Sequence, residues 1–223
     1  MATTKQTHMI AGRMVEFQEK FSRLSNDDAQ YVIQNAGEAI DLFVTAVTNR
    51  IQVAVQAAVS LLSAVICSFS VPATRKRFIA KEKFKVDASK KAKVKILHLS
   101  DNFQRWFLGK IEEPFAGSTI YGRKLEKDSV DRPILAELGG PEAAKTTLTE
   151  LYVAMAAQAH GESGALLTNG RANIFYIEDI NGLLRAVRVG WFGAGWRVRA
   201  YSVGGPDVWD ADVRAFSRNY LIS

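Results

Sequence analysis

The clearest candidate for a binding site in this sequence is a stretch of lysine and arginine residues with aromatic neighbours. Between residues 75 and 95 the chain carries ten Lys and Arg residues against only Glu82 and Asp87. Binding of a polyanion requires such a track of cations, and binding of a single nucleic-acid strand also requires aromatic faces on which bases stack. The composition of this stretch therefore predicts contact with nucleic acid or another polyanion.

A second basic group lies in the strand predicted over residues 196–203. Alternation along a strand places Arg197, Arg199 and Tyr201 on one face, while Trp196 and its alternate neighbours point the other way. The alternative is a half-buried sheet whose outer face is simply solvated. The candidate polyanion-binding residues are Arg75, Lys76, Arg77, Lys83, Lys85, Lys90, Lys91, Lys93, Lys95, Arg197, Arg199 and Tyr201.

The sequence offers little for catalysis or for metal binding. The three histidines, His8, His98 and His160, and the single Cys67 form no cluster with the spacing of a structural zinc site. No Gly-x-Ser-x-Gly elbow surrounds any serine, so a catalytic triad has no local support. We predict no metal and no cofactor, and an enzyme without a recognisable motif remains an alternative.

Composition and charge place the chain among folded proteins. It has 223 residues, of which 48% are hydrophobic and 23% charged, and its formal net charge is +6. These values are typical of a globular domain, and the positive charge favours a negatively charged partner. The N-terminus lacks the apolar core of a secretory signal, and one cysteine suits a reducing compartment. The sequence therefore predicts a cytoplasmic protein.

The N-terminal part, residues 1–74, is predicted to be helical. Apolar spacing of three and four indicates a short amphipathic helix over residues 9–24, and Ser25 or Asn26 caps a second helix that runs from about residue 27 to about residue 50. This second helix is expected to bury the side chains of Tyr31, Val32, Leu42, Phe43 and Val47.

A third helix is predicted over the charge-free segment 51–74, which Pro72 ends. Small and polar residues recur in it at every third or fourth position, which draws one narrow stripe along a helix. Such a stripe favours a helix packed among other helices, and the alternative is a membrane span over residues 51–71. The same helices could bury their apolar faces against a second copy, so a helix-mediated oligomer or membrane-tethered assembly protein is the second functional hypothesis.

Residues 75–223 are predicted to form an α+β domain. Helices are indicated over residues 101–110 and 141–158, and strand patterns cover residues 94–97, 118–125, 173–177, 183–192, 196–203 and 213–216. The Asn181-Gly182 pair and the glycines at 193 and 195 supply turns between three successive strands. The predicted fold is therefore a helical N-terminal segment followed by an α+β domain with a mainly antiparallel C-terminal β-meander.

Several segments between residues 78 and 219 are distinctive: FKVDASKKAKVKILHLSDNFQRWFLGKIEEP, SVDRPILAELGG, TTLTELYVAM, GALLTNGRANIFYIEDINGLLRAV, WRVRAYSV and VRAFSRN. Together they resemble a family of short proteins without an assigned function that recur in candidate-phyla bacteria of very small genome. The resemblance implies no activity, cofactor or catalytic residue. It does agree with a boundary near residue 75. The leading expectation is a non-catalytic cytoplasmic binding protein that contacts a polyanion.

Overall fold

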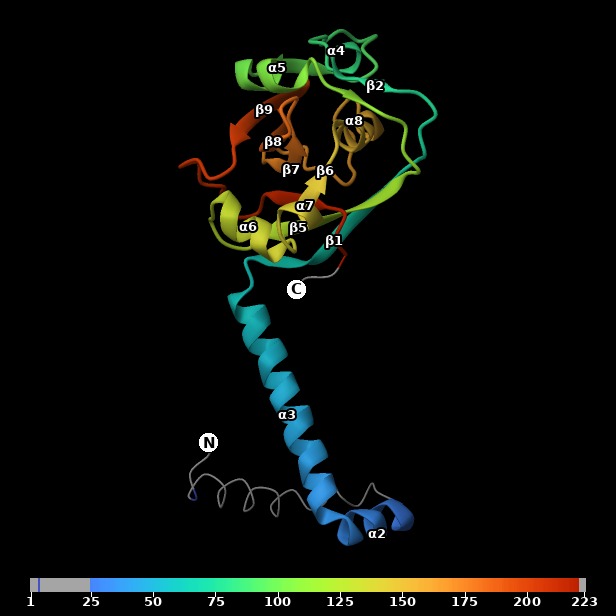
Figure 1. Ribbon diagram of the computed structural model, residues 1–223, viewed down its shortest axis with the longest axis vertical. Coiled ribbons are helices and arrows are strands. Elements are labelled where there is room, and N and C mark those ends of the chain that lie inside the picture. Colours follow the sequence, from blue (N-terminus) through green and yellow to red (C-terminus); the bar gives the residue numbers. More distant parts are fainter. Residues whose placement is uncertain (1–3, 5–24, 221–223) are drawn as a thin grey trace. The chain divides into compact units, whose positions relative to one another are not determined.

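The structure of the protein is a computed structural model that describes residue 4 and residues 25–220 (Figure 1). The helix predicted over residues 9–24 lies outside the described residues. The chain divides into two compact units, Met1–Val59 and Ser60–Ser223. The second unit therefore begins before residue 75, because it includes the strand that follows Ser60.

The first unit contains helices α2 (Asn26–Gln34) and α3 (Ala36–Val59). The predicted second helix is therefore present, although a turn at Asn35 divides it. Its expected burial is wrong for the side chains that the structure describes, because Leu42 is 63% exposed and Phe43 is 45% exposed. Val32 and Val47 are exposed as well.

The third helix predicted over residues 51–74 is correct only over residues 51–59, where it continues α3, and is wrong over the rest of the segment. Helix α3 ends at Val59, and strand β1 (Leu62–Val71) follows in the second unit. Between its buried ends, Leu62 and Val71, half-buried and exposed side chains of β1 alternate, as in a strand, and Ile66 on the exposed side is 48% exposed. Pro72 thus ends a strand. Among the residues described, no helix is both long and apolar enough to cross a membrane.

The second unit is built on one large sheet with the strand order β1-β5-β10-β7-β8-β9-β3. Strand β6 pairs with β7 beyond the end of β10, and β2 and β4 form a separate pair. The strands after β1 are β2 (Phe78–Ile79), β3 (Ile96–Leu99), β4 (Ile111–Glu112), β5 (Ser118–Leu125), β6 (Lys145–Thr146), β7 (Asn173–Glu178), β8 (Leu184–Trp191), β9 (Trp196–Ser202) and β10 (Arg214–Ser217).

The sheet is mixed, so the predicted antiparallel meander describes only its middle. Strands β7, β8 and β9 form consecutive antiparallel pairs, as expected. Strand β10 instead lies parallel to β7, and β3 lies parallel to β9. These two pairings join segments far apart in the sequence, which local turn patterns do not specify. The α+β class is correct, and the finer description is corrected to a mixed sheet.

The helices of the second unit are short. They are α4 (Ala80–Lys83), α5 (Asp101–Phe107), α6 (Asp131–Glu137), α7 (Pro141–Ala144) and α8 (Leu148–Ala157). The helix predicted over residues 141–158 is interrupted, because Thr147 begins a new helix. Its hydroxyl accepts a hydrogen bond from the Glu150 backbone N–H at 3.2 Å, and the Glu150 carboxylate accepts one from the Thr147 N–H at 2.7 Å.

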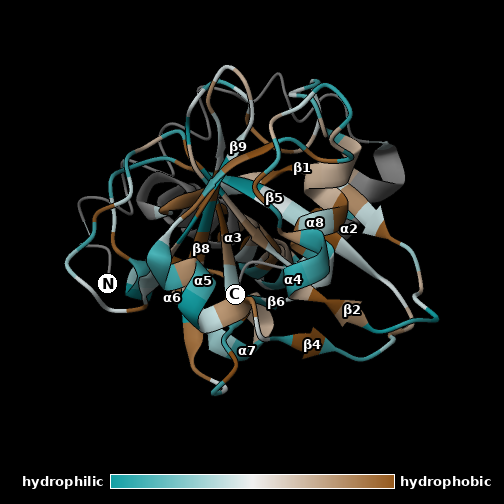
Figure 2. Ribbon diagram, turned by 90° about the horizontal axis from the view of Figure 1, so that it is seen from above, coloured by the Kyte–Doolittle hydropathy of each residue, from teal (hydrophilic) through white to brown (hydrophobic). Residues whose placement is uncertain are grey.

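The two faces of the sheet pack against different helices (Figure 1). One face, with Val187, Val198 and Phe216, forms a core with α5 and α8. On this side α4 is mostly hydrophilic, whereas β2 is hydrophobic (Figure 2). The opposite face, with Ile174 and Ala186, packs against α6 and α7. Along β8 and β9 this second face also carries arginine residues.

Candidate nucleic-acid interface

Three arginine side chains share one face of the β8–β9 pair, and we call Arg188, Arg197 and Arg199 the arginine face. In the antiparallel register Arg188 of β8 is directly opposite Arg199 of β9, and Arg197 is opposite Gly190. Neighbouring residues of β9 confirm the expected alternation, because Trp196 and Val198 are buried while the three residues of the arginine face are half-buried.

The arginine face has no carboxylate counter-ion within the described part of the chain. Some other guanidinium groups do have one: Arg185 Nε lies 2.9 Å from Asp179 Oδ2, and Arg218 Nε lies 2.7 Å from Glu150 Oε1. Like charges directly opposite each other on a sheet repel and cost stability. The Arg188–Arg199 pair therefore creates an unneutralised positive site that an anion would stabilise.

Aromatic rings lie next to the arginine face. The Arg197 guanidinium lies 4.7 Å from the centroid of the Phe192 ring, which is 36% exposed. Tyr201, two residues after Arg199 on the same face, packs edge-on against Trp209 with ring centroids 5.5 Å apart. Arginine and aromatic side chains on one face are what a single nucleic-acid strand requires, because phosphates pair with cations and bases stack on rings.

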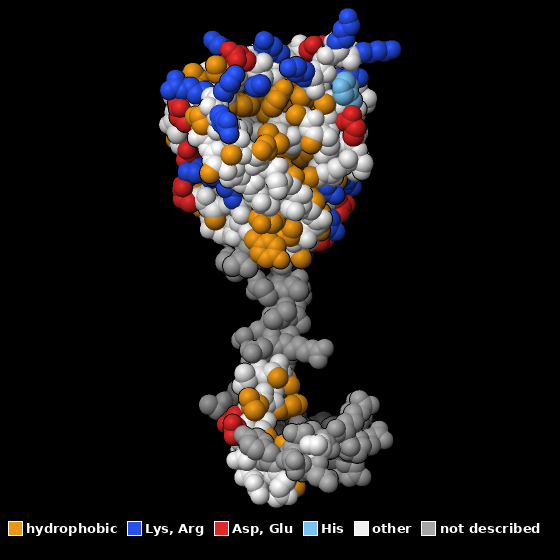
Figure 3. Space-filling view, turned by 90° about the vertical axis from the view of Figure 1, so that its right-hand side faces the viewer, with side chains coloured by type: hydrophobic (Ala, Val, Ile, Leu, Met, Phe, Trp, Pro, Cys, Tyr) orange, Lys and Arg blue, Asp and Glu red, His pale blue; other side chains and the backbone are white. Residues whose placement is uncertain are grey.

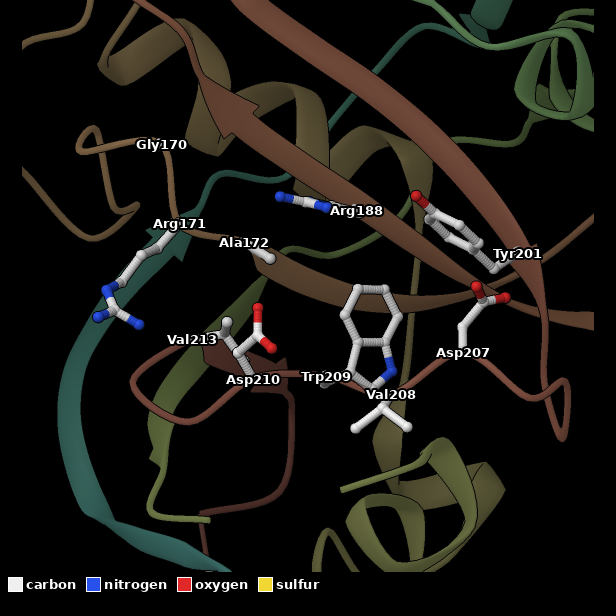
Figure 4. A pocket seen from close by; sticks show the side chains of 10 residues that line it. All are labelled: Gly170, Arg171, Ala172, Arg188, Tyr201, Asp207, Val208, Trp209, Asp210 and Val213. Atoms are coloured by element: carbon white, nitrogen blue, oxygen red, sulfur yellow. The ribbon is translucent and has the colours of Figure 1, made fainter. Parts of the chain in front are cut away.

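A hollow of about 210 Å³ opens beside Arg188 (Figure 4). Arg188 comes from β8 and Tyr201 from β9, and the other wall is the loop between β9 and β10. The residues that line the hollow are Gly170, Arg171, Ala172, Arg188, Tyr201, Asp207, Val208, Trp209, Asp210 and Val213. The hollow therefore has both positive and negative side chains in its walls.

The charged side chains that line this hollow differ in whether they have a partner among the described residues. Arg171 donates to the carbonyl oxygen of Ala211 at 2.8 Å and lies 3.3 Å from the Asp212 carboxylate, and its guanidinium points away from the other lining residues in Figure 4. By contrast, neither Asp207 nor Asp210 forms a hydrogen bond or ion pair through its side chain with any described residue. Their carboxylates are thus available to a ligand.

The loop that carries these aspartates is anchored by a buried carboxylate. Asp131, 2% exposed at the start of α6, accepts hydrogen bonds from Trp209 Nε1 at 2.8 Å and from the Tyr176 hydroxyl at 2.9 Å. The backbones of Trp209 and Ser129 exchange two further hydrogen bonds. Burial raises the pKa of Asp131, although both side-chain hydrogen bonds act in the opposite direction. These contacts hold the loop in one position over β8 and β9.

The structure distributes the predicted lysine track over several elements. Residues 75–77 lie between β1 and β2, and Arg77 lies 3.0 Å from the Glu113 carboxylate. Lys83 ends α4, and its ammonium group lies 5.7 Å from the centroid of the Tyr152 ring. Lys85, Lys90, Lys91 and Lys93 are exposed. Lys and Arg side chains gather at the end of the sheet domain where α4 lies (Figure 3).

The predicted lysine track lies next to strand β9 at Lys95. The backbone carbonyl of Lys95 accepts a hydrogen bond from the Trp196 N–H at 2.8 Å, one residue before Arg197. His98 of β3 is the neighbour of Arg197 in the parallel pair of β3 and β9. The structure therefore brings Lys95, Arg197, Arg199 and Tyr201 to neighbouring strands, whereas Arg75, Lys76 and Arg77 are attached to a different part of the sheet.

Sequence reasoning missed Arg188 and the loop residues of the hollow. Strand β8 contains both Arg185 and Arg188, and because they are three residues apart they lie on opposite faces of the sheet. The hairpin register, which pairs Trp191 with Trp196, places Arg188 opposite Arg199. The short turn between these tryptophans is visible in the sequence and could have identified Arg188. Gly204-Gly205-Pro206 does mark a break after β9, but no local pattern shows that the residues after it lie beside Arg188.

The two described histidines lie apart from this hollow. His98 and His160 are both exposed. The carboxylate of Glu162 accepts a hydrogen bond from the backbone N–H of His160, which is a turn contact that leaves the imidazole unused. Among the described residues, no group of three or more His, Cys, Asp or Glu side chains could hold a metal ion.

Comparison with protein-family models, with curated proteins and with solved structures finds no match to this chain.

Proposed function

We propose that this protein is a non-catalytic binding protein that holds single-stranded nucleic acid against the arginine face. The observation that carries the proposal is the Arg188–Arg199 pair, two opposed guanidinium groups without a counter-ion in the described chain. The repulsion between the two cations costs stability. A phosphate group between them would offset this cost, because it accepts charge-assisted hydrogen bonds from both guanidinium groups.

Aromatic residues favour a single strand over a duplex as the ligand. Phe192 and Tyr201 flank the arginine face, and bases of a single strand can stack on such rings, whereas bases of a duplex are already stacked on each other. The lysine track would add sequence-independent attraction at the Lys95 end of β9.

The test is a fluorescence-polarisation titration of a labelled single-stranded RNA and a DNA oligonucleotide at two salt concentrations. If three arginines each contact a phosphate, affinity should fall about 20-fold between about 50 and about 200 mM salt. Binding that is absent, or that does not change with salt, would contradict the proposal.

A matched pair of variants separates the arginine face from general positive charge. The double substitution R188Q/R199Q and the double substitution K90Q/K91Q each lower the formal net charge of +6 by two. We expect R188Q/R199Q to lose most of the binding and K90Q/K91Q to lose less, because the lysines are exposed on a separate segment. Equal losses would show that net charge alone drives the binding.

Self-association through the first unit is a second candidate function. Ile40, Val44 and Val47 share one face of α3 at spacings of four and three residues, and they are 59%, 52% and 39% exposed. A second copy of α3 could cover this uncharged face. Light scattering of the full chain should then give a mass above the 24.6 kDa of one copy, and V44D should return it to that mass. A monomeric wild-type chain would contradict this candidate.

A further inference from the structure

The hollow beside Arg188 combines opposite charges that do not neutralise each other. Arg188 forms one wall, and Asp207 and Asp210 belong to the opposite loop (Figure 4). No ion pair joins Arg188 to either aspartate in the described chain, so a ligand can reach both kinds of group. The side chain of Arg188 offers hydrogen-bond donors only, and the two carboxylates offer acceptors only. A ligand that fits must present acceptors on one side and donors on the other.

The size of the hollow limits the ligand to about one heterocyclic base. Pockets for whole drug-sized ligands measure about 300–1,000 Å³, and this hollow measures about 210 Å³. Tyr201 and Trp209 supply aromatic surface in its wall, and Val208 supplies apolar surface. A planar heterocycle with polar edges therefore matches the hollow better than a whole nucleotide does.

We propose that the hollow binds one base of the nucleic-acid strand and selects bases that carry an exocyclic amino group. The inference rests on the proposed function, because the arginine face must first hold the strand. In cytosine the carbonyl oxygen and ring nitrogen accept from an arginine while the amino group donates to a carboxylate. Guanine offers the same two kinds of edge. Thymine and uracil offer one donor, the ring N3–H, but it lies between two carbonyl oxygens, which the carboxylates repel.

The loop is built to keep the two aspartates in place for such selection. Asp207 and Asp210 flank Trp209, whose indole N–H donates to the buried Asp131 and whose backbone is paired with Ser129. Neither aspartate supports the fold through a hydrogen bond or ion pair of its side chain in the described residues. Replacement of both should therefore leave the fold intact and change the binding of the strand.

The experiment measures the affinity of the full chain for oligo(dC) and oligo(dT) of equal length at one salt concentration. We expect the wild-type chain to bind oligo(dC) about fivefold or more tightly than oligo(dT). In D207A/D210A the ratio should fall to about one. The affinity for oligo(dT) should rise in this variant, because two negative charges beside the arginine face are gone.

A control variant with the same change in charge is E82A/E142A, which removes two exposed carboxylates outside the hollow. It should raise the affinity for both oligonucleotides and leave their ratio unchanged. Far-ultraviolet circular dichroism of each variant checks the fold.

The possible failures are distinguishable. If the wild-type chain binds both oligonucleotides equally, or if D207A/D210A keeps the wild-type ratio, base selection by this hollow is wrong while the proposed nucleic-acid binding stands. If neither oligonucleotide binds at low salt, the proposed function is wrong as well.

Discussion

Arg188 and Arg185 occupy the same strand, yet opposite faces of the sheet give them opposite roles. Arg185 pairs with the fully buried carboxylate of Asp179, and its guanidinium lies 4.0 Å from the centroid of the Trp106 ring. Arg188 instead faces Arg199. A positively charged residue that has found a partner stabilises the fold, whereas one that faces another cation is free for a ligand at a cost in stability.

The substitution R199Q tests this difference. Removal of one of the two opposed charges should raise the free energy of unfolding by about 0.2–1 kcal/mol, while oligonucleotide binding weakens. The control R185Q should lower it by about 2–3 kcal/mol, because the buried Asp179 then loses its cation. Urea unfolding measures both. A destabilised R199Q would mean that Arg199 has a structural role that the register does not reveal.

The buried carboxyl group of Asp131 should make the free energy of unfolding depend on pH. The sign of this dependence is opposite to that of a carboxyl group whose pKa is lowered on folding. Burial raises its pKa in the folded chain above its value in the unfolded chain, so the folded state holds the proton more readily. The stability that this proton contributes is full below the unfolded pKa and is lost as the pH rises through the folded pKa. The hydrogen bonds from Trp209 and Tyr176 oppose this shift, because they favour the ionised form of Asp131.

The substitution D131N removes this titration while it keeps one oxygen acceptor. The free energy of unfolding of the wild-type chain, relative to D131N, should fall as the pH rises from about 4, the ordinary pKa of an aspartate, to neutral. Urea unfolding at a series of pH values measures the difference. A difference that grows in favour of the wild-type chain with rising pH would show that hydrogen bonding outweighs burial at Asp131.

Strand β1 depends on a side chain that is distant in the sequence. Glu137, at the end of α6, accepts hydrogen bonds from the Leu61 N–H at 2.6 Å, the Leu62 N–H at 2.8 Å and the Ser60 hydroxyl at 3.0 Å. This carboxylate fixes the point at which the chain enters the sheet. E137A should lower the free energy of unfolding by about 2–3 kcal/mol, because three donors lose a charged acceptor.

The matched control is E137Q, which keeps a carbonyl oxygen at the same place and should lose less stability than E137A. Urea unfolding of both variants measures the effect. If E137A unfolds at the same urea concentration as the wild-type chain, the entry of β1 is determined by the packing of Leu62 alone.

At the element scale, local turn chemistry explains which predictions succeeded. Strand β5 was predicted at the residues that form it, 118–125, and β7, β8 and β9 were predicted to within about one residue at each end. The reason is that Asp179 and Gly182 form a turn between β7 and β8 in which the Asp179 carboxylate accepts from backbone N–H groups. Such contacts are local, so the sequence shows them.

Residues 62–71 form a strand and not the predicted helix because the pattern of the segment 51–74 fits two periods. Small and polar residues recur every three or four positions, as in a helix, and residues 62–71 also alternate as in a strand. The strand conformation of residues 62–71 is determined by pairing with β5 and by the hydrogen bond from Leu62 to Glu137, and both partners are distant in the sequence. The parallel pairings of β10 and β3 escaped prediction for the same reason. In the candidate site, Asp207 and Asp210 were missed because only the fold brings them to Arg188.

At the scale of the whole molecule, the boundary between the two units decides which fragment can fold. The second unit begins at Ser60, and β1 contributes the buried side chains of Leu62 and Val71 to the two opposite cores. A fragment that starts at residue 75 lacks this strand and leaves the edge of β5 unpaired. The position of the boundary therefore determines which fragment is stable.

We expect the fragment 60–223 to unfold in one cooperative transition in urea and to bind single-stranded oligonucleotides, because it contains the whole sheet, the arginine face and the hollow. The fragment 75–223 should unfold at a lower urea concentration or aggregate, since it loses the apolar area that β1 buries and exposes the β5 edge. Circular dichroism and light scattering distinguish the two. Equal stability of both fragments would place β1 outside the cooperative core and would move the boundary back to the position near residue 75 that the charge pattern indicates.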